Sequence, residues 1–97
     1  MNGFYLLGKI ASEPEKGETI NGTKLCRLKI SVDKTVKDQD DNSDLIEVTL
    51  FRNLAEADYE VGQSVGINGK MVSSNYEKDG NQYYNVRLVG NNVSVIA

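Results

Sequence analysis

The chain has 97 residues, which is enough for one domain and too few for two. Its 11 Lys and Arg against 14 Asp and Glu residues give a net charge of −3, so nucleic acid would have to be held by a local basic patch rather than by bulk charge. No apolar run approaches the roughly 18–20 residues of a membrane span, and no basic segment opens the N-terminus, so we expect neither a transmembrane helix nor a signal peptide.

Histidine is absent and Cys26 is the only cysteine, which excludes several classes of site. Ser-His and Cys-His nucleophilic sites, His-based zinc sites and an intrachain disulfide are all ruled out. A lone cysteine fits a reducing, cytoplasmic compartment. Because Cys26 falls in the inward set of a predicted strand, we interpret it as a buried structural thiol.

The first half of the chain predicts three β-strands. The first covers residues 3–12, whose segment Phe4-Tyr5-Leu6-Leu7 is apolar on both faces, and Glu13-Pro14-Glu15 ends it. After the turn signal Asn21-Gly22, residues 23–36 alternate well between apolar and polar side chains. This period of two places in the core Cys26, Leu28, Ile30 and Val32, and in solvent Arg27, Lys29, Ser31 and Asp33.

A polar loop over residues 37–44 precedes the third strand, residues 45–52. This strand points Ile46, Val48 and Leu50 inward, and it points outward Leu45, Glu47, Thr49 and Phe51. Phe51 is therefore an aromatic side chain on an otherwise mostly polar face. The loop's acids, Asp38, Asp40, Asp41 and Asp44, lack the glycine and glutamate of a calcium loop, so we interpret them as solvated.

The second half predicts a short helix and a hairpin. Residues 54–59 form one or two helical turns that Gly62 ends, and a fourth strand runs from residue 65 to residue 76. The tip Lys78-Asp79-Gly80-Asn81 supplies the positive φ angles of a tight turn. A fifth strand follows over residues 82–89, and residues 92–96 form a last short extended piece.

Five strands with a helix after the third are typical of an all-β, five-stranded OB-fold Greek-key barrel. A β-sandwich of this length usually has about seven strands, and an SH3-like barrel has no helix at that position. We therefore expect a single OB-fold domain over residues 1–97.

The chain also resembles the bacterial single-stranded DNA-binding protein (SSB) family along nearly its whole length. The resembling segments, in chain order, are residues 2–10, 13–15, 22–32, 48–51, 54–56, 62–65 and 69–71, followed by Tyr76 before a hairpin tip. Members of that family stack single strands on aromatic side chains, and at four such positions this chain carries Val36, Leu45, Phe51 and Tyr76. It has no tryptophan, and we expect it to lack the family's acidic C-terminal tail.

Phe51 and Tyr76 are the candidate stacking residues. An aromatic ring on a solvent face is a platform for bases, although Phe51 in a loop or subunit contact, or a cross-strand pair of Tyr76 with Tyr83 or Tyr84, would also explain the pattern. Phosphates would be contacted by the basic set Arg27, Lys29, Lys9, Lys34, Lys70 and Arg87. Eight of the 14 acids but only one of the 11 bases lie in residues 38–60, so the rest of the chain is basic.

The leading functional hypothesis is a sequence-tolerant single-stranded DNA-binding protein, not an enzyme, that acts in DNA replication, recombination and repair without cofactor or metal. The alternative is an OB-fold protein-interaction or primosome-type module with weak or no nucleic-acid binding, which the acidic net charge favours. The resemblance further implies homo-oligomers, dimers or tetramers, that pair through the first strand, at Phe4, Tyr5, Leu6 and Leu7. A final segment, residues 92–96, folded over that apolar strand would instead leave a monomer.

Overall fold

The computed structural model describes residues 1–33 and 43–97. Its elements are β1 (Phe4–Ile10), β2 (Glu15–Glu18), β3 (Lys24–Asp33), β4 (Ser43–Phe51), α1 (Asn53–Glu56), β5 (Ser64–Lys78) and β6 (Asn81–Val95). Residues 34–42 lie outside the described residues. They include the C-terminal end of the predicted second strand and most of the predicted polar loop.

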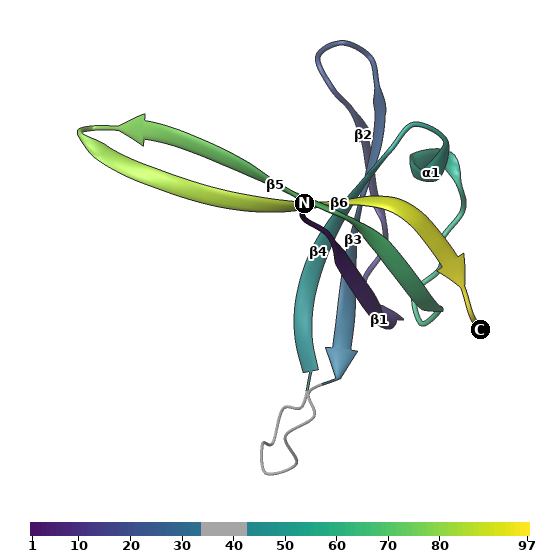
Figure 1. The fold of residues 1–97 in the computed structure, drawn as a ribbon. Coiled ribbons are helices and arrows are strands. Elements are labelled where there is room, and N and C mark those ends of the chain that lie inside the picture. The colour runs from purple at the N-terminus through teal and green to yellow at the C-terminus, as the bar shows by residue number, and fades with distance from the viewer. Residues whose placement is uncertain (34–42) are drawn as a thin grey trace.

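Five of the strands close into a barrel (Figure 1). The sheet runs β1-β5-β6-β4-β3-β2, and an additional pairing of β1 with β3 closes it. All neighbours are antiparallel except β4 and β6, which pair in parallel at Val48–Leu88 and Thr49–Val89. This connectivity, with a helix between β4 and β5, confirms the predicted OB-fold barrel.

The barrel core contains most of the inward-facing residues that the alternation predicted, together with Ile10, Val65 and Ile67, whereas Val32 and Ile46 are only partly buried. Cys26, Leu28 and Ile30 from β3 and Val48 and Leu50 from β4 are completely buried. Ala55 of α1 and Tyr59 after it join the same cluster, and the Tyr59 hydroxyl donates a hydrogen bond of 2.7 Å to the carbonyl oxygen of Leu54. The helix ends at Glu56, three residues before the predicted end, while Tyr59 still packs on the core.

One residue of the predicted outward-facing set, Thr49, differs from the expectation. Thr49 was expected in solvent, but it is only 4% exposed. Its Cα partners are Arg27 on β3 and Val89 on β6, so a strand lies on each side of it. Pairing with β6, which an isolated strand pattern does not reveal, explains this burial.

Two further strand boundaries differ from the expectation. β2 was not predicted, because its four residues are all exposed and carry no apolar alternation, although it pairs with β3 along its whole length. The predicted fifth strand and the final extended piece are one continuous strand, β6. The segment Gly90-Asn91-Asn92 suggests a break, yet Gly90 is buried and paired with Gly69 on β5.

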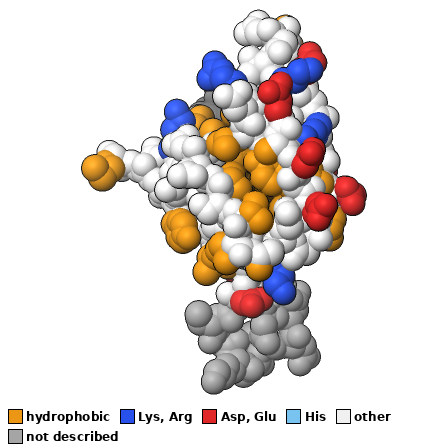
Figure 2. Space-filling model, turned by 90° about the vertical axis from the view of Figure 1, so that its right-hand side faces the viewer, with side chains coloured by type: hydrophobic (Ala, Val, Ile, Leu, Met, Phe, Trp, Pro, Cys, Tyr) orange, Lys and Arg blue, Asp and Glu red, His pale blue; other side chains and the backbone are white. Residues whose placement is uncertain are grey.

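Beyond this glycine pair, β5 and β6 leave the barrel as a long two-stranded arm, residues 70–89 (Figure 1). A register shift between Asn68 and Gly69 marks the exit, as expected for a bulge that bends a strand. The arm ends in the predicted tight turn, in which Asp79 and Gly80 have φ angles of 53° and 79°. On the side of the molecule away from the arm, hydrophobic side chains gather at the centre and charged side chains lie around them (Figure 2).

Candidate nucleic-acid interface

A groove of about 630 Å³ lies where the arm leaves the barrel. Three parts of the chain form it: the loop between β2 and β3, the end of β4 with the start of α1, and the base of the arm. Its lining residues are Thr19, Asn21, Thr23, Phe51, Arg52, Leu54, Lys70, Val72, Arg87, Val89, Gly90 and Asn91.

The groove brings together three of the predicted site residues, Phe51, Lys70 and Arg87. Phe51 is half-buried and stands outside the core cluster, so one part of its ring remains accessible. The lining contains three cationic residues and no acidic one. Within the described residues these cations make no ion pair, which leaves them available to an anionic ligand.

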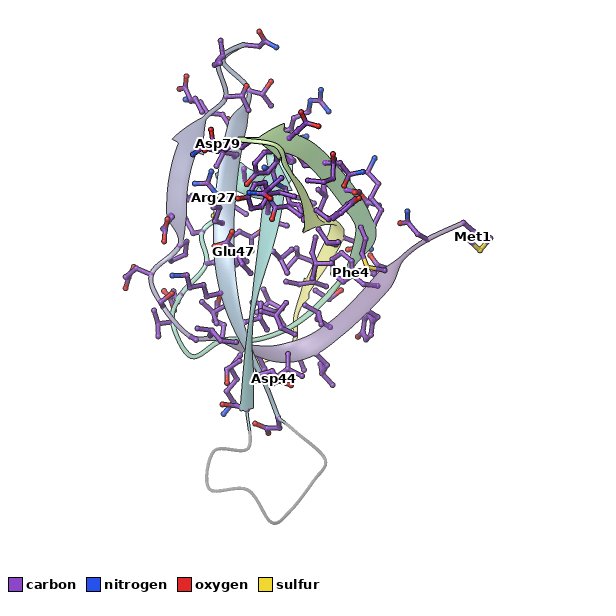
Figure 3. The ribbon with its side chains drawn as sticks, turned by 90° about the vertical axis from the view of Figure 1, so that its left-hand side faces the viewer. Met1, Phe4, Arg27, Asp44, Glu47 and Asp79 are labelled. Carbon is purple, nitrogen blue, oxygen red and sulfur yellow. The ribbon has the colours of Figure 1, made fainter. Side chains whose placement is uncertain are left out.

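Arg27 and Lys29 continue the same outer face along β3, as the alternation predicted. Figure 3 shows Arg27 and Glu47 in the view from the side of the arm. Arg27 is exposed and lies beside Thr49, whereas Lys29 is paired in register with Glu47. The Lys29 ammonium is also 3.9 Å from the Glu15 carboxylate, so its charge is partly balanced by two acids.

The arm carries the second predicted aromatic. Tyr76 stacks on its cross-strand partner Tyr83, with ring centroids 5.1 Å apart and planes inclined by 18°. A cross-strand pair of Tyr76 with Tyr83 was the alternative to base stacking that the sequence allowed. Both rings are nevertheless exposed. The pair therefore presents a wide aromatic surface on the arm.

The register divides the arm into two chemically different faces. The face that continues from the groove carries Lys70, Val72, Ser74, Tyr76 and Lys78 on β5 with Asn81, Tyr83, Asn85, Arg87 and Val89 on β6. The opposite face carries no cation and exposes Met71, Tyr84 and Val86. Basic and paired aromatic residues are thus concentrated on the groove side.

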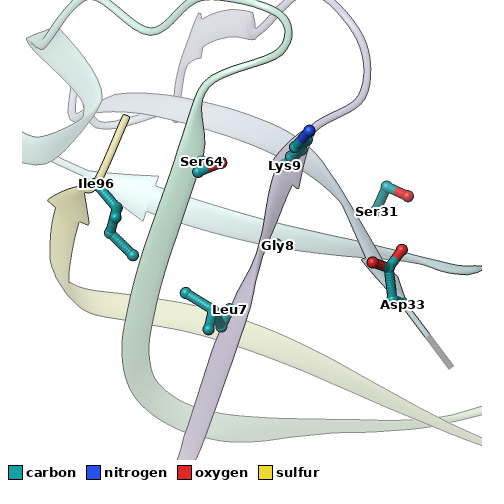
Figure 4. A pocket seen from close by; sticks show the side chains of 7 residues that line it. All are labelled: Leu7, Gly8, Lys9, Ser31, Asp33, Ser64 and Ile96. Carbon is teal, nitrogen blue, oxygen red and sulfur yellow. The ribbon is translucent and has the colours of Figure 1, made fainter. Parts of the chain in front are cut away.

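Of the remaining predicted cations, Lys9 lies away from the groove. Lys9 lines a different hollow of about 530 Å³ together with Leu7, Gly8, Ser31, Asp33, Ser64 and Ile96 (Figure 4). Lys34 lies outside the described residues, as does Val36. Leu45, at another of the family's aromatic positions, is exposed near the start of β4.

Five polar or charged residues of the groove lining were not predicted as site residues: Thr19, Asn21, Thr23, Arg52 and Asn91. The first three lie in the turn between β2 and β3, and their polar side chains are typical of a turn and gave no separate sign of a binding site. Arg52 was counted with the acidic region of the chain, although it directly follows Phe51. A search for cations adjacent to the outward aromatic would have found it.

Cys26 is buried, as predicted, and burial raises the pKa of its thiol. Within residues 1–33 and 43–97, no group of three or more His, Cys, Asp or Glu side chains is arranged to hold a metal ion. In the same ranges no helix is long and apolar enough to cross a membrane.

Comparison with solved structures supports the fold. The N-terminal domain of the PriB protein from Thermoanaerobacter tencongensis, described as a dimeric structure, superposes with a TM-score of 0.72 at 21% identity. The match covers 99% of this chain and 97% of that domain. At this identity, the likeness establishes a shared fold.

Comparison with known sequences identifies relatives along the whole chain. A single-stranded DNA-binding protein of Oceanobacillus iheyensis is 28% identical over 102 residues, covering 99% of this chain and 63% of that protein. A single-stranded DNA-binding protein of Deinococcus radiodurans is 31% identical over 104 residues, covering 100% of this chain and 35% of that protein. The chain thus spans from about a third to somewhat under two thirds of the length of these two relatives. The model of the single-strand binding protein family matches residues 1–96, and the chain belongs to this family.

Proposed function

We propose that this protein binds single-stranded DNA with little sequence preference and without catalysis, in support of DNA replication, recombination and repair. The observation that carries the proposal is the groove in which Phe51 lies with Lys70 and Arg87 and with no acidic residue. A ring that stacks any base, beside cations that contact phosphates, binds single strands without reading sequence. The relatives named single-stranded DNA-binding protein support the same activity.

The bound DNA strand would follow the basic face from the groove onto the arm. Phe51 stacks one base at the groove, and the Tyr76–Tyr83 pair offers a second stacking surface on the same face of the arm. Lys70 and Arg87 contact phosphates between the two, and Arg27 extends the path along β3.

The test is a titration of a fluorescently labelled dT oligonucleotide, followed by anisotropy at low and moderate salt. We expect binding that weakens as salt rises, because phosphate contacts release counterions. A duplex of the same length is the control and should bind more weakly, since its bases are not free to stack on Phe51. Absence of binding at low salt would contradict the proposal and favour a module that acts through protein contacts.

The groove cations should determine the salt dependence. Replacing Lys70 or Arg87 with alanine is expected to flatten the slope of log affinity against log salt by about 0.7 each, the value per phosphate contact in single strands. Arg27→Ala should do the same, and Lys29→Ala should do so less because of its two acidic neighbours.

Lys24→Ala is the matched control for these slopes. Lys24 is equally exposed, but it pairs with Glu18 and lies outside the groove lining. The slope of this variant should equal that of the unchanged protein. Equal slopes for Lys24→Ala, Lys70→Ala and Arg87→Ala would show that the strand does not pass through the groove.

We also propose that the protein self-associates through β1. Tyr5 and Leu7 are 65% and 56% exposed on the outer face of this strand, and residues 92–96 lie beside β5 without covering them. The patch is therefore largely exposed on the single chain. Within the described residues, β1 pairs with β3 only at Lys9 and Ile10, so the edge of β1 before them is open for pairing with a second copy.

Self-association predicts a mass above that of one chain. Sedimentation equilibrium at micromolar concentration should show a dimer or tetramer of the 10.7 kDa chain. Tyr5→Asp should shift this species toward monomer, because it places a charge in the apolar contact. Tyr84→Asp, the same change at another exposed tyrosine, is the control and should leave the mass unchanged. A single 10.7 kDa species for the unchanged protein would contradict the proposal.

A further inference from the structure

Arg52 combines a cationic side chain at the groove with a backbone conformation that is unfavourable for it. Its φ and ψ angles are 59° and −127°, a region that glycine occupies freely and residues with a Cβ atom seldom adopt. Apart from Asp79 in the hairpin turn, it is the only residue other than glycine with a positive φ in residues 1–33 and 43–97.

Hydrogen bonds on both sides hold Arg52 in this conformation. Its N–H donates to the carbonyl oxygen of Lys24 on β3 at 2.9 Å. Its own carbonyl oxygen accepts from the N–H groups of Ala55 and Glu56 in α1, at 3.0 and 3.2 Å. The chain thus turns from β4 into α1 at this one residue, and the surrounding structure leaves it no relaxed alternative.

Glycine would meet the backbone demand here at no steric cost, yet the chain carries arginine. The side chain is exposed and makes no ion pair or hydrogen bond within the described residues. It therefore makes no polar contact with the fold that would offset the strain. It does add a third cation, next to Phe51, to a groove lining without acids.

We propose that Arg52 contacts a phosphate of the bound strand, and that the protein keeps it in a strained conformation for this purpose at the expense of stability. A guanidinium group suits this role, because its fixed N–H groups bind phosphate oxygens in pairs. Lys70 and Arg87 from the base of the arm and Arg52 from the turn between β4 and α1 together give the groove lining three positive charges. The backbone of the bound DNA strand then runs through the groove along these cations. This inference rests on the proposed binding of single-stranded DNA.

Three substitutions of Arg52 test the phosphate contact and the backbone strain separately. Arg52→Gly removes both the cation and the strain, Arg52→Ala removes only the cation, and Arg52→Lys keeps charge and strain. Each variant is titrated with the labelled dT oligonucleotide at several salt concentrations, and its melting temperature is measured without DNA.

We expect the glycine and alanine variants to bind about three- to tenfold more weakly, as for one lost charged hydrogen-bonding group. Their salt slopes should be about 0.7 flatter, while the lysine variant keeps the slope of the unchanged protein. The glycine variant should melt about 4 °C or more above the alanine variant, because strain relief exceeds the extra freedom that glycine gives the unfolded chain.

The results distinguish failure of this inference from failure of the proposed function. If the unchanged protein binds the oligonucleotide and the glycine and alanine variants bind equally well with the same slope, Arg52 contacts no phosphate and only the inference is overturned. If the melting temperature of the glycine variant is equal to or below that of the alanine variant, the backbone of Arg52 is not strained. If the unchanged protein does not bind at all, the proposed function fails and the inference fails with it.

Discussion

Phe51→Ala is expected to weaken binding of a dT oligonucleotide by about 1–3 kcal/mol, the range for loss of one base–aromatic stack. The free energy of unfolding should fall by only about 1 kcal/mol, because Phe51 is half-buried and lies outside the core cluster. Anisotropy titration at fixed salt measures the first quantity and urea denaturation the second. The combination of a large binding effect with a small stability effect identifies a stacking residue.

Two further variants sharpen this result. Tyr84→Ala removes an exposed aromatic from the opposite face of the arm and should leave the affinity unchanged. Phe51→Trp keeps a stacking surface and introduces the only tryptophan of the chain, whose fluorescence should be quenched when a base stacks on it. A loss of several kcal/mol in folding stability for Phe51→Ala would instead show that the ring supports the core.

Gly69→Ala is expected to destabilise the fold by about 3 kcal/mol, near the upper end of the cost of overpacking. A Cβ atom on Gly69 would lie 1.9 Å from the carbonyl oxygen of Val89 and 2.9 Å from the Cα of Gly90. These are backbone atoms of the neighbouring strand, so no side-chain rotation relieves the clash. The two strands must separate where the arm leaves the barrel, and urea denaturation should show the loss of stability.

Gly17→Ala is the matched control, since Gly17 also lies in a strand. A Cβ atom there would meet only the Leu25 side chain, at an ordinary 3.8 Å, so the free energy of unfolding should change by about 0.5 kcal/mol or less. Lys70 and Arg87 lie just beyond Gly69 in the arm, so Gly69→Ala should also lower the affinity for single strands. Unfolding of both glycine variants at the same urea concentration would contradict the role assigned to Gly69.

The amino-acid sequence alone determined those features whose signals are local. Alternation along residues 23–36 identified the buried residues Cys26, Leu28 and Ile30 and the partly buried Val32, because each side chain of a strand faces the side opposite to its neighbour's. Asp79-Gly80 identified the hairpin turn, because its φ angles suit few other residue pairs. The order of strands and helix then left the OB-fold as the matching architecture, and Phe51 stood out as an aromatic on an outer face.

Features that depend on contacts between distant segments could not be predicted from local patterns. The pairing of β2 cannot be predicted from an apolar pattern, because all four of its residues are exposed and its contacts with β3 are backbone pairing and surface ion pairs. The fusion of two predicted pieces into β6 depends on Gly69 and Gly90 meeting across two strands. The groove joins Phe51 to Lys70 and Arg87 and excludes Lys9, because closure of the barrel, rather than position along the chain, sets which outer faces adjoin. The strained conformation of Arg52 arises from hydrogen bonds to both β3 and α1. No pattern in the neighbouring sequence predicts these bonds.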